Sequence, residues 1–145
     1  MAREVLLTLT GLSLDESGQE TVTRQTVKAQ YAFREGRHFF RYEEQEDPAS
    51  SPTLCLLKLQ EGYLELSKKG AVYTRMVFEN GKEHRTDYVT PFGNLWLGIC
   101  THRAGFTHLP AGADPVFLQY VIQYTLALEG QPLGEYTMTL QAVSA

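Results

Sequence analysis

The sequence has little positive charge. Its 13 lysines and arginines are outnumbered by 17 aspartates and glutamates, the formal net charge is −4, and no lysine or arginine follows Arg103. A surface that binds nucleic acid needs clustered cations to meet the phosphates, and an anionic membrane surface makes the same demand. We therefore expect neither a nucleic acid nor a membrane as a partner of this chain.

Long apolar runs and cysteines are also scarce. The N-terminal apolar run at residues 5–9 is interrupted by Thr8, so it is too short and too polar for a signal peptide or a membrane span. The two cysteines, Cys55 and Cys100, each lie in an apolar run, and we expect buried free thiols rather than a disulfide. Without an export signal, a reducing cytoplasm is the expected location.

The motifs of common enzyme classes are missing. The sequence contains no HExxH, CxxC, GxSxG, GxGxxG or P-loop pattern, and no two of its histidines have a close metal-ligand spacing. The acidic run at residues 43–47 lacks the glycine and the ligand spacing of a calcium loop, so a solvated strand end is expected there. We expect no metal, no cofactor and no catalytic residue.

What the sequence has in abundance is period-two alternation. In the stretch from residue 71 to residue 97, Thr74, Met76 and Phe78 share one face of a predicted strand. Asn80-Gly81 then predicts a hairpin turn of type I′, which needs a positive φ at both central residues. The Pro-Phe-Gly sequence at residues 91–93 predicts a corner before alternation resumes.

The same alternation extends over the whole chain. About ten strand-like runs, of which residues 116–128 are the clearest, are separated by turn signals every eight to twelve residues or so, and no convincing helix is found. Residues 47–53 and 108–115 are the predicted long loops. The pattern predicts one all-β domain over residues 1–145, and its spacing is typical of a sandwich or an up-and-down barrel. Short hairpin connections and several runs of more than about ten residues favour an antiparallel up-and-down barrel of about eight to ten strands, whose closure also removes the exposed edges of such apolar strands.

Four segments resemble the YwiB-like family of small bacterial proteins, a domain of unknown function. They are Phe40-Arg41-Tyr42-Glu43-Glu44, Met76-Val77-Phe78, Tyr88-Val89-Thr90-Pro91-Phe92-Gly93 and Gln123-Tyr124-Thr125-Leu126. They occur in the family's order and span most of the chain. The resemblance implies a calycin (lipocalin-like) barrel in the bacterial cytoplasm. It implies no established activity, so no catalytic residue is carried over.

A candidate site follows from the predicted inward faces. If Phe40 faces the interior, so does Glu44, and a carboxylate facing apolar walls must be paired or hydrogen-bonded. Tyrosine and threonine hydroxyls from other strands are available for this. The predicted ligand-binding residues are Tyr42, Glu44, Met76, Tyr88, Thr90, Tyr120 and Tyr124. The alternative is a structural polar cluster that holds the strands in register.

Three functions are compatible with these residues. The first is a non-enzymatic protein that binds a small, partly apolar ligand in the barrel mouth. The second is a structural or interaction protein whose barrel is filled by side chains and whose outer aromatic residues, such as Trp96 or Phe117, mediate homodimerisation. The third is an enzyme in which burial raises the pKa of Glu44 and makes it a general base. We rank the enzyme last, because no nucleophile, metal set or cofactor motif accompanies Glu44.

Overall fold

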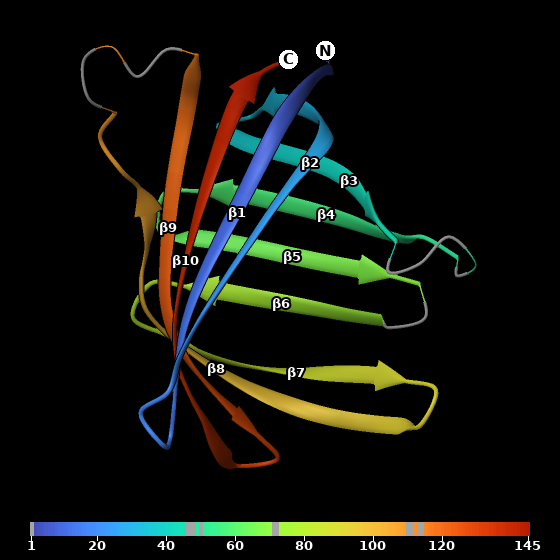
Figure 1. The fold of residues 1–145 in the computed structure, drawn as a ribbon, viewed down its shortest axis with the longest axis vertical. Coiled ribbons are helices and arrows are strands. Elements are labelled where there is room, and N and C mark those ends of the chain that lie inside the picture. Colours follow the sequence, from blue (N-terminus) through green and yellow to red (C-terminus); the bar gives the residue numbers. More distant parts are fainter. Residues whose placement is uncertain (1, 46–48, 50, 71–72, 110–111, 113–114) are drawn as a thin grey trace.

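Ten strands follow one another along the chain, and the part of the chain that the structure describes contains no helix (Figure 1). The computed structural model describes residues 2–45, 49, 51–70, 73–109, 112 and 115–145, without the side chain of Thr90. The strands are β1 (Arg3–Asp15), β2 (Glu20–Arg34), β3 (Arg37–Glu44), β4 (Thr53–Gln60), β5 (Tyr63–Lys69), β6 (Tyr73–Glu79), β7 (Glu83–Thr90), β8 (Gly93–Phe106), β9 (Val116–Leu128) and β10 (Gln131–Ser144).

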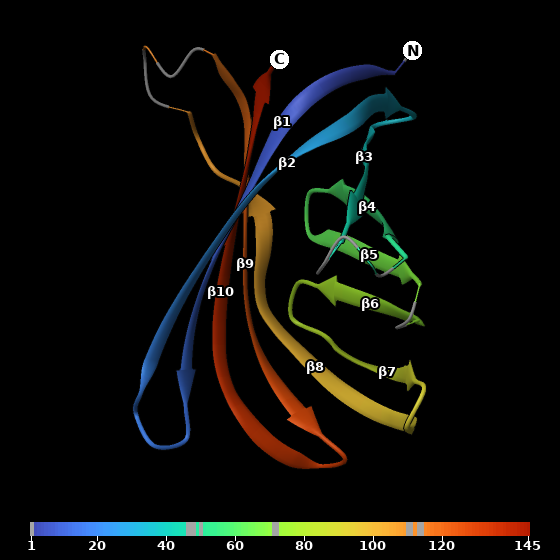
Figure 2. The ribbon, with the colours of Figure 1, turned by 45° about the vertical axis from the view of Figure 1, so that its right-hand side comes forward.

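The strands form one closed antiparallel barrel. Each strand pairs with its neighbours in the chain, and β1 pairs with β10 to close the sheet. The long strands β1, β2, β8, β9 and β10 make one side of the barrel, and the shorter strands β3 to β7 make the other (Figure 2). The all-β barrel predicted from the sequence is therefore confirmed. The predicted loops at residues 47–53 and 108–115 lie partly outside the described residues.

Alternating burial explains why these sequences fold as strands of a closed sheet. In β4, Leu57 is 1% exposed and points into the barrel, whereas the adjacent Leu56 is 40% exposed. Period-two burial also occurs in β1 and β5, and it places their apolar side chains in the same interior. The core contains large residues such as Phe40, Phe78 and Tyr120, all of which are at most 1% exposed.

The predicted type I′ turn at Asn80-Gly81 is wrong. Gly81 has a φ of 74°, but Asn80 is absent from the described non-glycine residues with a positive φ, so only one of the two required positive values is present. Positive values occur as consecutive pairs at Glu35-Gly36 and Glu129-Gly130 instead.

The reason for this difference lies in the pairing of the two flanking strands. Over the described residues, β6 and β7 share only two pairs, Tyr73 with Val89 and Thr74 with Tyr88. The strands then diverge, and the turn at residues 80–82 bonds instead to Thr101 of β8. The turn therefore does not have to match the twist of a tight two-stranded ribbon, which is what favours type I′.

Candidate functional site

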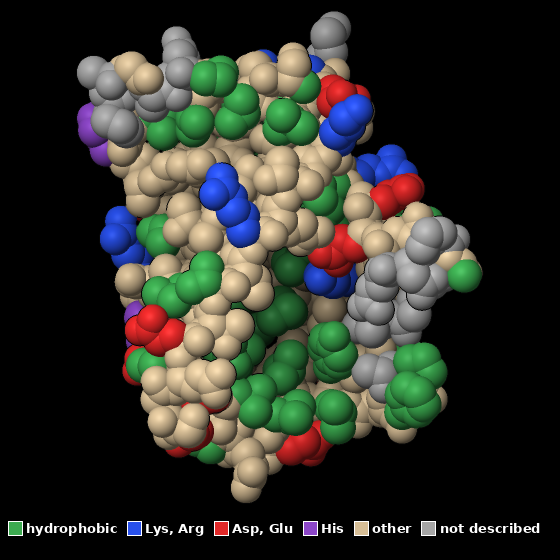
Figure 3. Space-filling model, in the orientation of Figure 1, with side chains coloured by type: hydrophobic (Ala, Val, Ile, Leu, Met, Phe, Trp, Pro, Cys, Tyr) green, Lys and Arg blue, Asp and Glu red, His purple; other side chains and the backbone are tan. Residues whose placement is uncertain are grey.

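The barrel interior is filled at one end and hollow at the other. The inward rows of β1, β2 and β10 are apolar near Val5, Ala29 and Ala142 and become polar or less tightly packed toward the opposite end. There they enclose a cavity of about 360 Å³. Its lining includes Gln25, Tyr42, Glu44, Leu66, Lys68, Tyr124, Tyr136 and Met138. The space-filling view shows hydrophobic side chains recessed in the centre of one face (Figure 3).

An ion pair between Glu44 and Lys68 stands at the wall of this cavity. The Lys68 Nζ atom lies 2.9 Å from the Glu44 Oε1 atom, and the two side chains are 30% and 24% exposed. Glu44 also accepts hydrogen bonds from the Cys55 thiol at 3.3 Å and from the Gln25 amide at 3.2 Å. Strand register explains the cluster, because Tyr42 is paired with Cys55 and Cys55 is paired with Lys68 across β3, β4 and β5.

The pair fixes the charges of the site. Burial alone would raise the pKa of Glu44, but the hydrogen bond and charge of Lys68, with bonds from Cys55 and Gln25, outweigh it and hold that pKa below its ordinary value. Burial works in the opposite direction on Lys68, and Glu44 again outweighs it, so the lysine pKa is raised. Burial and the adjacent Glu44 raise the pKa of the Cys55 thiol to about 12. At neutral pH, Glu44 is therefore a carboxylate, Lys68 is an ammonium and Cys55 is a neutral thiol.

This arrangement predicts a specific loss of stability in acid. A carboxyl whose folded pKa lies below its unfolded value of 4.5 stabilises the fold above that value and loses the contribution as the pH falls through the folded pKa. Urea unfolding measured from neutral pH to below pH 4.5 should therefore show a steeper loss of stability in the wild type than in Glu44→Gln. Glu43→Gln, which removes an exposed carboxylate from the same strand, is the control and should keep the wild-type dependence. Equal pH dependence in Glu44→Gln and the wild type would contradict this account of the pair.

The structure brings together three of the residues that the sequence analysis selected, because Tyr42, Glu44 and Tyr124 all line the cavity. Met76 is partly buried, packs against the core and is paired with Leu66 of the cavity wall. Tyr88 is half-buried in β7 and contributes to the electrostatic environment of Lys68.

Met76, Tyr88 and Tyr120 are not among the residues that line this cavity. Thr90 ends β7, but its side chain lies outside what the structure describes. Tyr120 is 1% exposed in the filled core, and its hydroxyl donates a hydrogen bond to the Gln60 carbonyl at 2.9 Å. It is a core residue away from the hollow end of the barrel.

Sequence reasoning missed Lys68, Tyr136 and Met138, although alternation contained the signal for each. Lys68 continues the inward row of Leu64 and Leu66 by one more step of two residues. Tyr136 is paired with Tyr124 across β9 and β10, so it shares the predicted inward face. The inward orientation of Lys68 was not predicted because the side chain is charged, and an inward lysine is exceptional unless a partner such as Glu44 is present.

Aromatic rings form another part of the wall. Tyr124 packs edge-on against Phe78, with ring centroids 4.7 Å apart, and stacks on Tyr136 at 5.3 Å with an angle of 13° between the planes. Burial raises the pKa of Tyr124 to about 12, with Tyr136 adding to the effect. The hydroxyl is therefore protonated at neutral pH and remains a hydrogen-bond donor.

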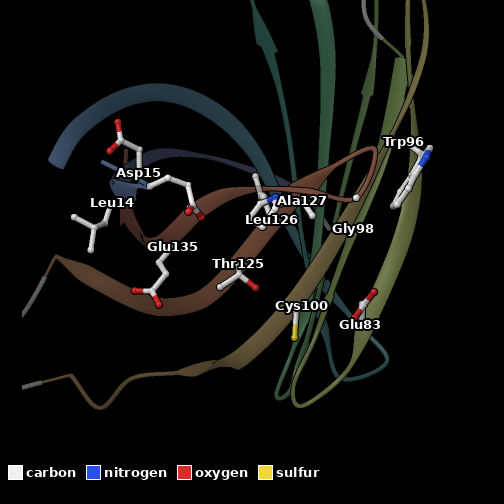
Figure 4. Close-up of a pocket in the computed structure, with 14 residues that line it drawn as sticks. Leu14, Asp15, Glu83, Trp96, Gly98, Cys100, Thr125, Leu126, Ala127 and Glu135 are labelled. Atoms are coloured by element: carbon white, nitrogen blue, oxygen red, sulfur yellow. The ribbon is translucent and has the colours of Figure 1, made fainter. Parts of the chain in front are cut away.

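A second hollow lies on the outer surface of the barrel. It has a volume of about 710 Å³, and its walls carry Trp96 and Glu83 opposite Asp15 and Glu135, with Cys100 between them (Figure 4). The cysteines are free, as the sequence predicted, but only Cys55 is buried. Cys100 is half-buried because its side chain lies on the opposite face of β8 from those of Ile99 and Thr101, which face inward. It borders this outer hollow.

The outer aromatic residues already have partners within the chain. The Arg85 guanidinium lies 4.0 Å from the centroid of the Trp96 ring, and Arg3 lies 4.6 Å from that of Phe117. Phe117 also packs against Tyr31 and the core. Within the described residues, no group of three or more His, Cys, Asp or Glu side chains is placed to hold a metal ion. The described chain also contains no helix that is long and apolar enough to cross a membrane.

Comparisons with known proteins identify a family and a related fold. The profile of the family described as "Domain of unknown function (DUF1934)" matches residues 7–140. The crystal structure of the ywiB protein from Bacillus subtilis matches with a TM-score of 0.78 and 18% sequence identity, over 99% of this chain and 93% of that one. At this identity the likeness concerns the fold alone. Among proteins with curated functions, none matches this sequence.

Proposed function

Because the chain belongs to the DUF1934 family, whose description assigns no activity, we propose its function from the cavity itself. The protein is a non-enzymatic binding protein that holds a small, partly apolar ligand in the hollow end of the barrel. The observation that carries this proposal is the cavity of about 360 Å³, in which an apolar and aromatic wall meets the Glu44–Lys68 pair. Apolar walls with a few convergent polar groups are the usual composition of small-ligand sites, and their volumes start at about 300 Å³.

The protonation states of the site support binding rather than catalysis. A general base works best with a pKa near the working pH, but Lys68 and the other donors lower the pKa of Glu44, against the sequence-based hypothesis that burial raises it. A raised pKa keeps Lys68 as an ammonium, which is not a nucleophile. Cys55 is fully buried and its pKa is raised, so it is held as the unreactive thiol.

The interaction protein of the second hypothesis has less support. It requires a filled barrel and aromatic rings available to a partner chain. The hollow end does not fit a filled barrel, and Trp96 and Phe117, the two rings selected from the sequence, already contact Arg85 and Arg3. We keep the cytoplasm as the proposed location, because both cysteines are free and reducing compartments are where free thiols persist.

Native mass spectrometry of protein purified from its own host tests the binding function. The wild type should carry a small-molecule adduct on the monomer. Thr23→Trp should abolish the adduct, because Thr23 is exposed and lines the cavity, so the larger ring enters it from the mouth. Val22→Trp should retain the adduct, because Val22 is 67% exposed and does not line the cavity. A dimer mass without any adduct would overturn the proposal in favour of the interaction protein.

A further inference from the structure

We propose that the ligand of this cavity is a small organic anion, with an acidic head group bound by the Lys68 ammonium and a planar apolar body against Tyr136. This inference rests on the proposed binding function and adds the chemical class of the ligand. It is carried by the hydrogen-bonding capacity left at the polar end of the cavity, by the charge balance there and by the size of the space.

Among the described residues, the Lys68 ammonium has unused hydrogen-bond donors at this end of the cavity. A lysine ammonium has three donors, and within the described residues Glu44 is the one acceptor bonded to Lys68. The Glu44 carboxylate, by contrast, already accepts from Lys68, Cys55 and Gln25. Two ammonium donors therefore remain for a ligand, and the Tyr124 hydroxyl, which also lines the cavity, is a further donor. Such a site favours a ligand head that is rich in acceptors, as a carboxylate is.

A cationic head is disfavoured by the same contacts. Aromatic rings beside a carboxylate can bind an ammonium group, and Tyr42 and Tyr124 line the same cavity as Glu44. Here, however, Glu44 is already neutralised by an ammonium at 2.9 Å, and a second cation would meet repulsion from Lys68. An anion meets a comparable repulsion from Glu44, but it can accept hydrogen bonds from the two Lys68 donors that the described residues leave unused, whereas Glu44 already accepts three hydrogen bonds.

The volume and the aromatic wall restrict the rest of the ligand. The cavity of about 360 Å³ lies near the lower end of the range of small-molecule sites, roughly 300 to 1,000 Å³. Tyr136 lies at the wall and is stacked on Tyr124, which in turn contacts Phe78. A flat ring of the ligand would extend this aromatic series, while Leu66 and Met138 add apolar contact. A compact aromatic acid therefore fits better than a long acyl chain.

The test compares three probes that share one ring system and differ in the charge of the head. Indoleacetate, indoleacetamide and tryptamine are titrated into the wild type, and binding is followed by NMR chemical shifts of the cavity residues. Indoleacetate should bind at least about tenfold more tightly than the amide, which corresponds to about 1.4 kcal/mol, and tryptamine should bind most weakly. Lys68→Met should remove the preference for the acid. Lys69→Met, which removes the next and exposed lysine of the same strand, should keep it.

The other possible outcomes overturn the anionic ligand, and they show separately whether the binding function still stands. Equal or tighter binding of the amide or of tryptamine in the wild type, or a preference for the acid that survives Lys68→Met, overturns the anionic ligand. If such binding is lost in Thr23→Trp, the binding function still stands. If none of the three probes binds, the anionic aromatic ligand is also overturned. Native mass spectrometry is then the remaining test of the binding function. Should Lys68→Met fail to fold, the neutral double variant Glu44→Gln with Lys68→Met replaces it.

Discussion

Replacing Leu57 with alanine should lower the free energy of unfolding by about 2–5 kcal/mol, the range for large-to-small changes in a packed core. Leu57 is 1% exposed and lies in the interior on β4, between β3 and β5. Truncation removes apolar contacts on both sides and leaves a void that the surrounding closed sheet cannot collapse to fill.

The matched control is the same substitution one residue earlier. Leu56 lies in the same strand and is 40% exposed, so Leu56→Ala should cost about 1 kcal/mol or less. Urea unfolding followed by circular dichroism measures both values. Similar costs for the two variants would mean that β4 does not present one face to the interior, which would contradict the barrel.

Gly134→Ala should destabilise the fold by at least about 2 kcal/mol, for two independent reasons. Gly134 has a φ of 146°, a region that is essentially reserved for glycine. It also follows a register shift in β10 and faces Asp15 across the β1–β10 pair, where a Cβ atom would collide with the Leu14 carbonyl oxygen. The obstacle is backbone, so a side-chain rotation cannot relieve the collision.

Gly98→Ala provides the comparison for this prediction. Gly98 is also a strand glycine, but a Cβ atom there would meet its neighbours at 3.8 to 3.9 Å, which is ordinary van der Waals contact. Thermal unfolding of both variants should show a large decrease in the midpoint for Gly134→Ala and a small change for Gly98→Ala. Unfolding of Gly134→Ala at the wild-type temperature would contradict the positive φ and the close backbone approach at Gly134.

The fold could be predicted from the sequence because alternation is a local property. In β9, residues from Leu118 to Ile122 repeat every second position, and any sheet that buries one face of such a strand gives the same pattern. The turn at Asn80-Gly81 was harder, because its geometry depends on how far β6 pairs with β7. The sequence of the turn itself does not contain that information.

The candidate site could be predicted only in part, for a related reason. Tyr42, Glu44 and Tyr124 lie on inward rows, and alternation alone places them in the interior. It does not say at which height of the barrel each lies, which is why Tyr120 was grouped with them. That height depends on the register between strands, and only the structure shows that Cys55 lies opposite Lys68. The lowered pKa of Glu44 also depends on Lys68, because the hydrogen bond and the charge of that lysine offset the effect of burial.

The pairing of the first strand with the last has a consequence for biosynthesis. Val5 lies opposite Ser144, and Tyr136 and Met138 of the cavity wall belong to β10, which is synthesised after the other nine described strands. A nascent chain that has completed β9 therefore has two unpaired sheet margins, and it has no finished pocket. The cavity wall is therefore complete only after β10 has been synthesised and has paired with β1.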